Sequence, residues 1–92
     1  MYAYAPGDYW GIDCAVFNGQ DYLVARDRTS SFIMAQEIVS QSARRITKVL
    51  DMWISKVGVP LVIRADNATC FHSKEFKDWA AQVFVKIVYS LG

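Results

Sequence analysis

The sequence has few of the residues that define zinc and disulfide proteins. It contains one histidine, His72, and two cysteines, Cys14 and Cys70, neither of which has a partner at short spacing. A histidine-based zinc cluster within the chain is therefore excluded, and neither a zinc knuckle nor a disulfide framework is indicated. We expect both thiols to be reduced and His72 to be a surface turn residue.

Long apolar runs are also missing. No stretch approaches the roughly 18 uninterrupted apolar residues of a membrane span, and the start of the sequence lacks the basic and then apolar order of a signal peptide. We therefore expect an intracellular protein with no membrane partner. The formal net charge is only +1, so any contact with nucleic acid is expected to be local rather than spread over the surface.

The composition is that of one small folded domain. The 92 residues are 53% hydrophobic and 14% aromatic, which is enough for a core and unlike a disordered tail. Small domains bury a smaller fraction of their surface, so we expect marginal stability. Residues 1–8 contain Pro6 and Gly7 without periodicity and are predicted to be a lead-in segment, and residues 9–92 are predicted to form one domain.

The first half of the chain predicts three antiparallel strands. Alternating apolar residues indicate one strand over residues 9–17 and another over residues 20–27. Asn18-Gly19 between them is typical of a type I′ hairpin turn. A polar turn then leads to a third strand, predicted over residues 31–37.

Asp13 is the least expected residue of the first strand. It pairs with Val24 in the register that the turn sets, and it lies on the face opposite Ile12, Cys14 and Val16. A carboxylate among apolar neighbours in a low-dielectric setting needs a partner, a proton or a cation. We therefore expect something in the folded protein to compensate this charge.

After the third strand the pattern changes to helical spacing. Apolar residues recur at intervals of three and four, which predicts an amphipathic helix with one buried stripe. Ser40 or Ser42 can cap its start, Gly58 can end it, and Pro60 prevents its continuation. The stripe consists of Ile46, Val49, Leu50, Trp53, Ile54 and Val57.

The second half predicts two further strands and a second helix. Branched apolar residues indicate strands over residues 61–66 and 85–89, and Ser73 can cap a helix between them. Trp53 and Trp79 are expected to pack in the core. The predicted order βββαβαβ gives an α/β fold with a mixed five-stranded sheet, in which strands 1 to 3 are antiparallel and strands 4 and 5 run parallel to strand 1.

Asp66 ends the fourth predicted strand, at the edge where open α/β sheets place their chemistry. If that strand lies beside the first and parallel to it, Asp13 and Asp66 lie side by side. Two adjacent carboxylates repel, and a divalent cation such as Mg²⁺ relieves the repulsion. A pair of such ions can activate a water or hydroxyl for attack on phosphorus. A structural alternative stays open, in which both acids are turn or capping groups of a plain α/β domain.

Several motifs carry a family resemblance from Trp10 onward. They are Trp10-Gly11-Ile12-Asp13, Asp27-Arg28-Thr29-Ser30, Val57-Gly58-Val59-Pro60, and Asp66-Asn67-Ala68-Thr69-Cys70-Phe71 followed by Ser73-Lys74-Glu75-Phe76. In this order and spacing, the chain resembles the catalytic core of integrases of retroviruses and long-terminal-repeat retrotransposons, closest to the gypsy-type enzymes. That resemblance implies the ribonuclease H-like fold.

The resemblance also implies roles for particular residues. Asp13 and Asp66 match the first two metal-binding acids of the family's catalytic triad, with Mg²⁺ or Mn²⁺ as cofactor. Asn67 would shape the loop beside the metal and Thr69 would lie near target DNA, so both are expected to take part in nucleic-acid binding. For the complete protein, the resemblance implies DNA as a partner, a homo-oligomer, and a location in the nucleus or in a retroelement particle.

Three departures from the family pattern bear on activity. Ala68 stands where the family has Gly, and it is strained if that backbone has a positive φ. The basic residues of the family's DNA-facing helix are not in this chain. The resemblance implies a third acid, a Glu, at a position beyond Gly92. Glu37, which ends a strand, and Glu75, which opens a helix, do not match its place in the family pattern. These residues alone are therefore expected to be catalytically silent, with an exposed sheet face that invites self-association.

Two functional hypotheses stay open. The first is a fragment of a polynucleotidyl transferase that, when complete, trims 3′ ends and joins DNA by metal-assisted transesterification. The alternative is a non-catalytic, degenerate or domesticated ribonuclease H-like module that binds nucleic acid or protein. Ala68 and the missing third acid favour the alternative, whereas Asp13 and Asp66 oppose it.

Overall fold

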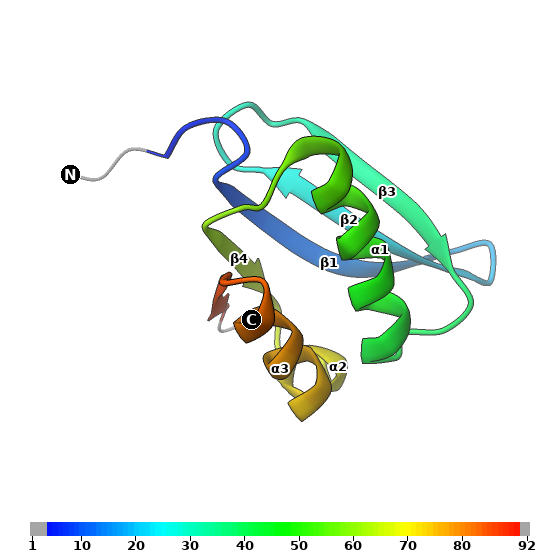
Figure 1. The fold of residues 1–92 in the computed structure, drawn as a ribbon. Coiled ribbons are helices and arrows are strands. Elements are labelled where there is room, and N and C mark those ends of the chain that lie inside the picture. The colour runs from blue at the N-terminus through cyan, green and yellow to red at the C-terminus, as the bar shows by residue number, and fades with distance from the viewer. Residues whose placement is uncertain (1–3, 91–92) are drawn as a thin grey trace.

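The computed structural model describes residues 4–90, so residues 1–3 of the predicted lead-in segment and residues 91–92 lie outside it. Its elements are β1 (Tyr9–Phe17), β2 (Gln20–Asp27), β3 (Ile33–Ile38), α1 (Ala43–Val57), β4 (Val62–Ala65), α2 (Thr69–His72), α3 (Lys74–Gln82) and β5 (Lys86–Tyr89). The described strands form one sheet in the order β3-β2-β1-β4-β5 (Figure 1). β1 is antiparallel to β2 and parallel to β4, and β4 is parallel to β5. The predicted fold class is confirmed.

The hairpin of β1 and β2 has the predicted bounds and register. Asn18 and Gly19 both have positive φ, at 51° and 75°, a conformation that these two residue types adopt at low steric cost. The turn places Asp13 opposite Val24. One dipeptide therefore sets which face of the sheet carries Asp13.

β3 begins later than the sequence predicts. The prediction covered residues 31–37, whereas the strand spans Ile33–Ile38. Ser31 has a φ of 63°, and its N–H donates to the Asp27 carbonyl (2.9 Å), so the turn continues through Ser31. At the other end, Ile38 is buried and pairs with Asp21, which extends the strand by one residue.

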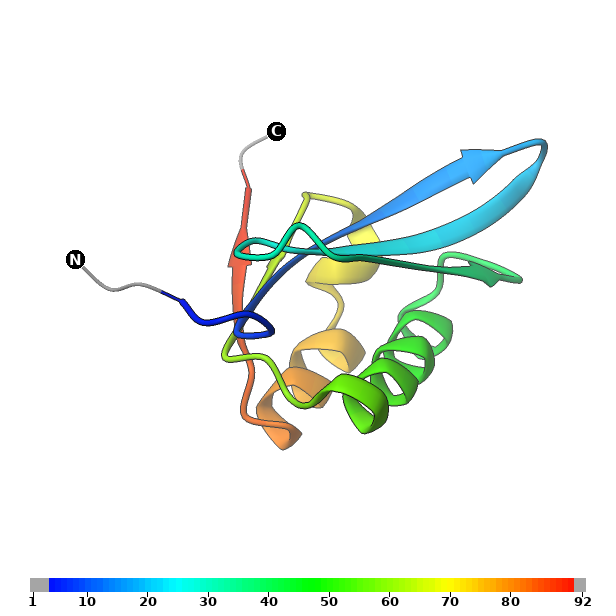
Figure 2. The same cartoon turned by 90° about the horizontal axis from the view of Figure 1, so that it is seen from above.

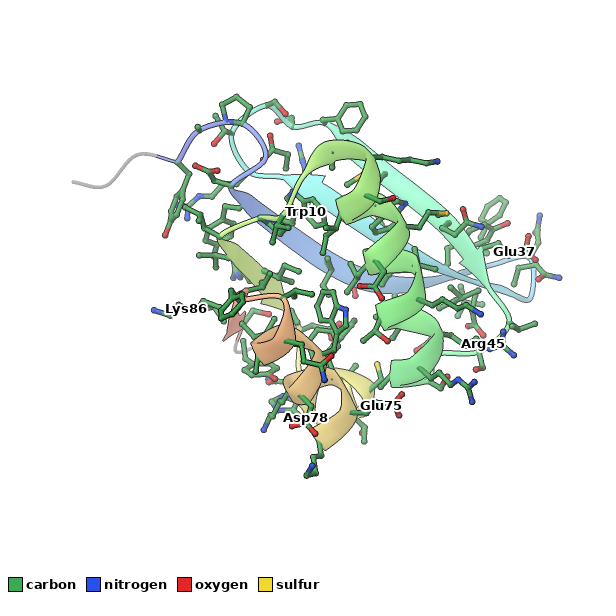
Figure 3. The ribbon with its side chains drawn as sticks, in the orientation of Figure 1. Trp10, Glu37, Arg45, Glu75, Asp78 and Lys86 are labelled. Carbon is green, nitrogen blue, oxygen red and sulfur yellow. The ribbon has the colours of Figure 1, made fainter. Side chains whose placement is uncertain are left out.

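α1 covers the sheet with its predicted apolar stripe. Of the two predicted caps it uses Ser42, whose side chain accepts an N–H of the first turn, and it ends at Gly58, which has a φ of 97°. Ile46 and Leu50 are fully buried on its inner face. They belong to one core cluster with Trp10 of β1, which lies between the sheet and α1 (Figure 3).

The segment after β4 contains one helix more than predicted. α2 is a single turn, too short to leave a periodic pattern in the sequence. It contains His72, which is exposed but lies in this helix and not in the predicted turn. The Ser73 hydroxyl donates to the Cys70 carbonyl of α2 (2.9 Å) and accepts the Phe76 N–H of α3 (3.2 Å). One side chain therefore closes α2 and caps α3, as predicted for the second helix.

Both predicted core tryptophans on the helices are buried. Trp53 lies on α1 and Trp79 on α3. The Trp79 indole N–H donates to the Asp51 carboxylate of α1 (2.7 Å), which joins the two helices across their contact. β4 and β5 fall within the predicted ranges and complete the sheet beneath α3.

The two faces of the sheet differ. α1 and α3 lie on one face (Figure 2), where Ile12 of β1 is buried. Within residues 4–90 no helix covers the opposite face, which carries Asp13. The β1–β2 hairpin projects beyond the helices, which explains why Val16 is 65% exposed although it shares the face of Ile12. No helix in the described part of the chain is long and apolar enough to cross a membrane.

Candidate metal centre

Asp13 and Asp66 meet because β1 and β4 are parallel neighbours. Ile12 is in register with Ala65. The residues that follow them, Asp13 and Asp66, therefore lie next to each other where β4 ends. The two carboxyl groups are close enough that the Asp66 carboxyl helps to raise the pKa of Asp13. The structure therefore brings together the two acids that the sequence singled out.

The pKa of the Asp13 carboxyl is raised above its ordinary value. Partial burial contributes most, the nearby Asp66 carboxyl adds to it, and the Cys14 N–H (2.8 Å) acts in the opposite direction. The surroundings of Asp13 are less apolar than the neighbouring residues in the sequence suggest. Asp13 is exposed on the uncovered sheet face, where solvent reaches it.

Asp66 is held by the turn that follows β4. Its Oδ1 accepts the Ala68 N–H (3.0 Å), and the Oδ1 of Asp13 accepts the N–H of Cys14 in a similar way. The Oδ2 atoms of both acids receive no backbone hydrogen bond from residues 4–90. Ala68 has a φ of −61°, so the strain considered for Ala in place of Gly does not arise.

Asn67 and Thr69, the predicted nucleic-acid contacts, are both exposed next to Asp66. Asn67 Oδ1 hydrogen-bonds with His72 Nε2 (3.2 Å), and the His72 ring stacks on the Tyr89 ring of β5 with centroids 4.0 Å apart. The Tyr89 hydroxyl donates to the carbonyl of residue 71 (2.6 Å). Sequence reasoning missed His72 and Tyr89 as the residues that fix this loop, because no periodicity links them to Asn67.

The two cysteines lie against each other near the acids. Burial, followed by the nearby Cys70, raises the pKa of Cys14 to about 12. The pKa of Cys70 is raised too, mainly by burial. Both thiols are therefore protonated at neutral pH, which disfavours them as thiolate ligands of a soft metal.

The donor set that the site offers is two carboxylates. Among residues 4–90, no three His, Cys, Asp or Glu side chains gather in a way that could hold a metal ion. Glu37 on β3 and Glu75 on α3 lie in separate parts of the molecule (Figure 3). Two adjacent carboxylates with no thiolate fit a hard divalent cation such as Mg²⁺ or Mn²⁺, which takes oxygen ligands and keeps water in its remaining positions.

Comparison with known proteins identifies the family and the fold of the chain. Residues 3–90 match the integrase core domain family, and the chain belongs to that family. The catalytic core domain of BIV integrase has a similar structure, with a TM-score of 0.85 and 20% sequence identity over 92% of this chain and 55% of that chain. The HTLV-2 integrase catalytic core domain, solved as a dimeric form in complex with magnesium, gives a TM-score of 0.87 and 22% identity over 91% of this chain and 60% of that one.

No curated protein sequence matches the chain. The family match and the two structures confirm the predicted integrase family and the ribonuclease H-like fold. The chain spans 55% and 60% of the length of the two structures that it resembles. The likeness to gypsy-type enzymes within the family stays a prediction.

Proposed function

We propose that this chain is part of a DNA-integrating polynucleotidyl transferase, in which Asp13 and Asp66 hold a divalent cation, Mg²⁺ or Mn²⁺. The observation that carries the proposal is the register of the parallel strands β1 and β4, which brings together two carboxyls from segments far apart in the sequence. Two like charges at one sheet edge are unfavourable unless a proton or a cation lies between them. Membership of the integrase core domain family supports the same function.

The chain's own contribution to this chemistry is to position the two carboxylates. The N–H groups of Cys14 and Ala68 orient one oxygen of each acid, and the other oxygen is left for the cation. When bound, the ion would polarise phosphate oxygens and activate an attacking water or hydroxyl. Because the pKa of Asp13 is raised, a proton competes with the cation, and metal affinity is expected to fall as the pH falls.

Nucleic acid is the proposed partner at this edge. Asn67 and Thr69 are exposed beside Asp66, where a strand whose phosphate reaches the cation would pass them. For the complete protein we propose 3′-end processing and strand transfer on DNA. The dimeric form of the HTLV-2 domain supports a homo-oligomer.

A titration with Mn²⁺ followed by NMR tests the metal site. Paramagnetic Mn²⁺ is expected to broaden the amide signals of Cys14, Asn67 and Ala68 before those of other residues. Asp13→Asn and Asp66→Asn are each expected to abolish this selective broadening at the same Mn²⁺ concentration, because either change leaves a single carboxylate. The matched control is Glu37→Gln, which alters an exposed acid on β3 and should leave the broadening unchanged.

Spectra that do not change at millimolar Mn²⁺ would contradict the proposal. They would favour the alternative, a non-catalytic ribonuclease H-like module that binds nucleic acid or protein. Broadening that survives in both Asp variants would likewise show that the ion binds elsewhere.

A further inference from the structure

The sheet face that carries Asp13 also carries a group of arginines. Gly11 of β1 is in register with Arg26 of β2 on one side and with Arg64 of β4 on the other. Residues in register on neighbouring strands share a face, so these two side chains flank Gly11 on the face that α1 and α3 leave uncovered. Two cations therefore lie on either side of a residue without a side chain.

These residues line an open hollow with Gly11 at its floor. No heavy atom lies within 4 Å of the place that a Cβ of Gly11 would occupy. Tyr9, Arg28 and Ser31 complete the lining, and the hollow has a volume of ≈ 370 Å³. The Arg28 guanidinium carbon lies 4.9 Å from the centroid of the Tyr9 ring, and this contact holds a third positive charge at the rim.

No carboxylate in the described range neutralises these charges. Between residues 4 and 90 the one ion pair joins Lys74 to Asp78 on α3, and the side chains of Arg26, Arg28 and Arg64 make no hydrogen bond. All three arginines are exposed. In a chain of net charge +1, three guanidinium groups without a carboxylate partner in residues 4–90 surround one hollow and form a local positive site, here called the arginine site.

We propose that the arginine site binds a phosphodiester of the nucleic-acid strand, one nucleotide away from the phosphate at the acid pair; this inference rests on the proposed function. Asp13 follows Gly11 by two residues and Asp66 follows Arg64 by two, a separation of about 7 Å along the strands. One nucleotide of an extended strand spans such a distance. Guanidinium groups bind phosphate oxygens through paired N–H donors, which gives both energy and orientation.

The order of charges along this face favours a nucleic-acid strand over an acidic peptide. The arginine site binds one phosphate directly, and the neighbouring acid pair binds the next one through a divalent ion. The carboxylates of a peptide would satisfy the arginine site but would have no regular repeat to match the second position. Asp13 and Asp66 would also repel them whenever no ion is bound.

Fluorescence anisotropy with a labelled single-stranded oligothymidylate tests the arginine site. The measurement is made in EDTA, so that no metal contributes, and over a series of NaCl concentrations. Arg26→Gln and Arg64→Gln are each expected to lower the affinity about tenfold at low salt. Each is also expected to reduce the slope of log K against log salt by about 0.7, because one phosphate contact is lost.

Arg45→Gln is the matched control, because Arg45 is an exposed arginine on α1, on the other side of the sheet (Figure 3). It should bind the oligonucleotide as the unaltered protein does. Arg26, Arg64 and Arg45 are all exposed. Each variant is therefore expected to keep the unfolding temperature of the unaltered protein, and this measurement checks that the fold is intact.

Equal affinities of Arg26→Gln, Arg64→Gln and Arg45→Gln for the oligonucleotide would overturn the proposal that the arginine site binds phosphate. Displacement of the oligonucleotide by oligoglutamate at lower concentration than by pyrophosphate would also overturn it, since the site would then prefer carboxylates. The Mn²⁺ titration of Arg26→Gln and Arg64→Gln gives an independent result. If the arginine variants bind both Mn²⁺ and DNA as the unaltered protein does, this inference is refuted and the proposed function is not. If the unaltered protein does not bind Mn²⁺, the proposed function is refuted.

Discussion

Asp27 shows how one carboxylate holds a turn together. It is buried, and it accepts the N–H groups of Gly7 and Ser30 (3.1 Å each) and the Ser30 hydroxyl (2.5 Å). Burial on its own would raise the pKa of this carboxyl, but the donors, with the Ser30 hydroxyl first, outweigh burial and lower it. Asp27 therefore ties the segment before β1 to the turn between β2 and β3.

Replacement of Asp27 tests this role at the scale of one residue. Asp27→Ala is expected to lower the free energy of unfolding by roughly 2–4 kcal/mol at neutral pH, because it removes charge-assisted hydrogen bonds and leaves partly buried donors unpaired. Urea unfolding measures the loss. Asp8→Ala is the control, since Asp8 accepts one exposed N–H, that of Ala5, and should lose much less.

The same variant has a defined pH dependence. The pKa of Asp27 is lowered in the folded protein, so its contribution is present above the ordinary value of 3.8 and is lost as the pH falls below that value. The difference between Asp27→Ala and the unaltered protein should therefore shrink below about pH 3.8. A difference that stays constant down to lower pH would contradict the assignment of the stabilisation to the ionised carboxyl.

At the scale of secondary structure, the corner between α2 and α3 depends on one hydroxyl. Ser73 ends the first of these helices through the Cys70 carbonyl and caps the second through the Phe76 N–H. Helices as short as α2 and α3 are marginal by themselves and gain stability from caps and tertiary packing. The corner also sets where Trp79 enters the core against α1.

Ser73→Ala is expected to lower the free energy of unfolding by about 1–2 kcal/mol, because it removes a cap and a second hydrogen bond. Ser73→Thr keeps a hydroxyl that can make both bonds and should recover most of the loss. Ser55→Ala serves as the control, since the hydroxyl of Ser55 lies exposed within α1 and donates to Met52. Thermal unfolding ranks the variants, and equal losses in Ser73→Ala and Ser55→Ala would rule out a capping role.

At the scale of the whole molecule, folding brings the two acids together and makes the ionised form of Asp13 less favourable. Asp13 and Asp66 approach only when β1 and β4 pair, and in the folded protein partial burial, followed by the nearby Asp66, raises the pKa of Asp13. A raised acid pKa means that the folded state disfavours the ionised form. The resulting loss of stability is absent below the ordinary value of 3.8, grows as the pH rises through the raised pKa, and is complete above it.

Asp13→Asn is therefore expected to stabilise the metal-free protein at neutral pH by about 0.5 kcal/mol, a small value because the side chain is exposed and solvent screens the charges. The gain should vanish near pH 3, where the carboxyl is protonated in both states. With excess Mn²⁺ the order should reverse, because only the unaltered protein binds the ion. Urea unfolding under the three conditions measures this. A clear loss of stability in metal-free Asp13→Asn at neutral pH would assign Asp13 a structural role.

Local features of this fold were predictable because neighbouring residues produce them. Asn18-Gly19 set the hairpin and its register, and the spacing of apolar residues defined α1. α2 was missed because a single turn leaves no period. The start of β3 was misplaced because alternation does not reveal that Ser31 takes a positive φ.

The amino-acid sequence alone determined the number and order of the strands, the main helices, the family and the two acids worth testing, since all of these depend on residue type and on short-range spacing. It left the meeting of Asp13 with Asp66 conditional on β4 lying beside β1. Only the tertiary structure decided that meeting, the position of Arg26 and Arg64 around Gly11, and the uncovered face that they share. The physical reason is that pairing between strands distant in sequence sets which side chains become neighbours, and periodicity within a strand carries no information on its partner.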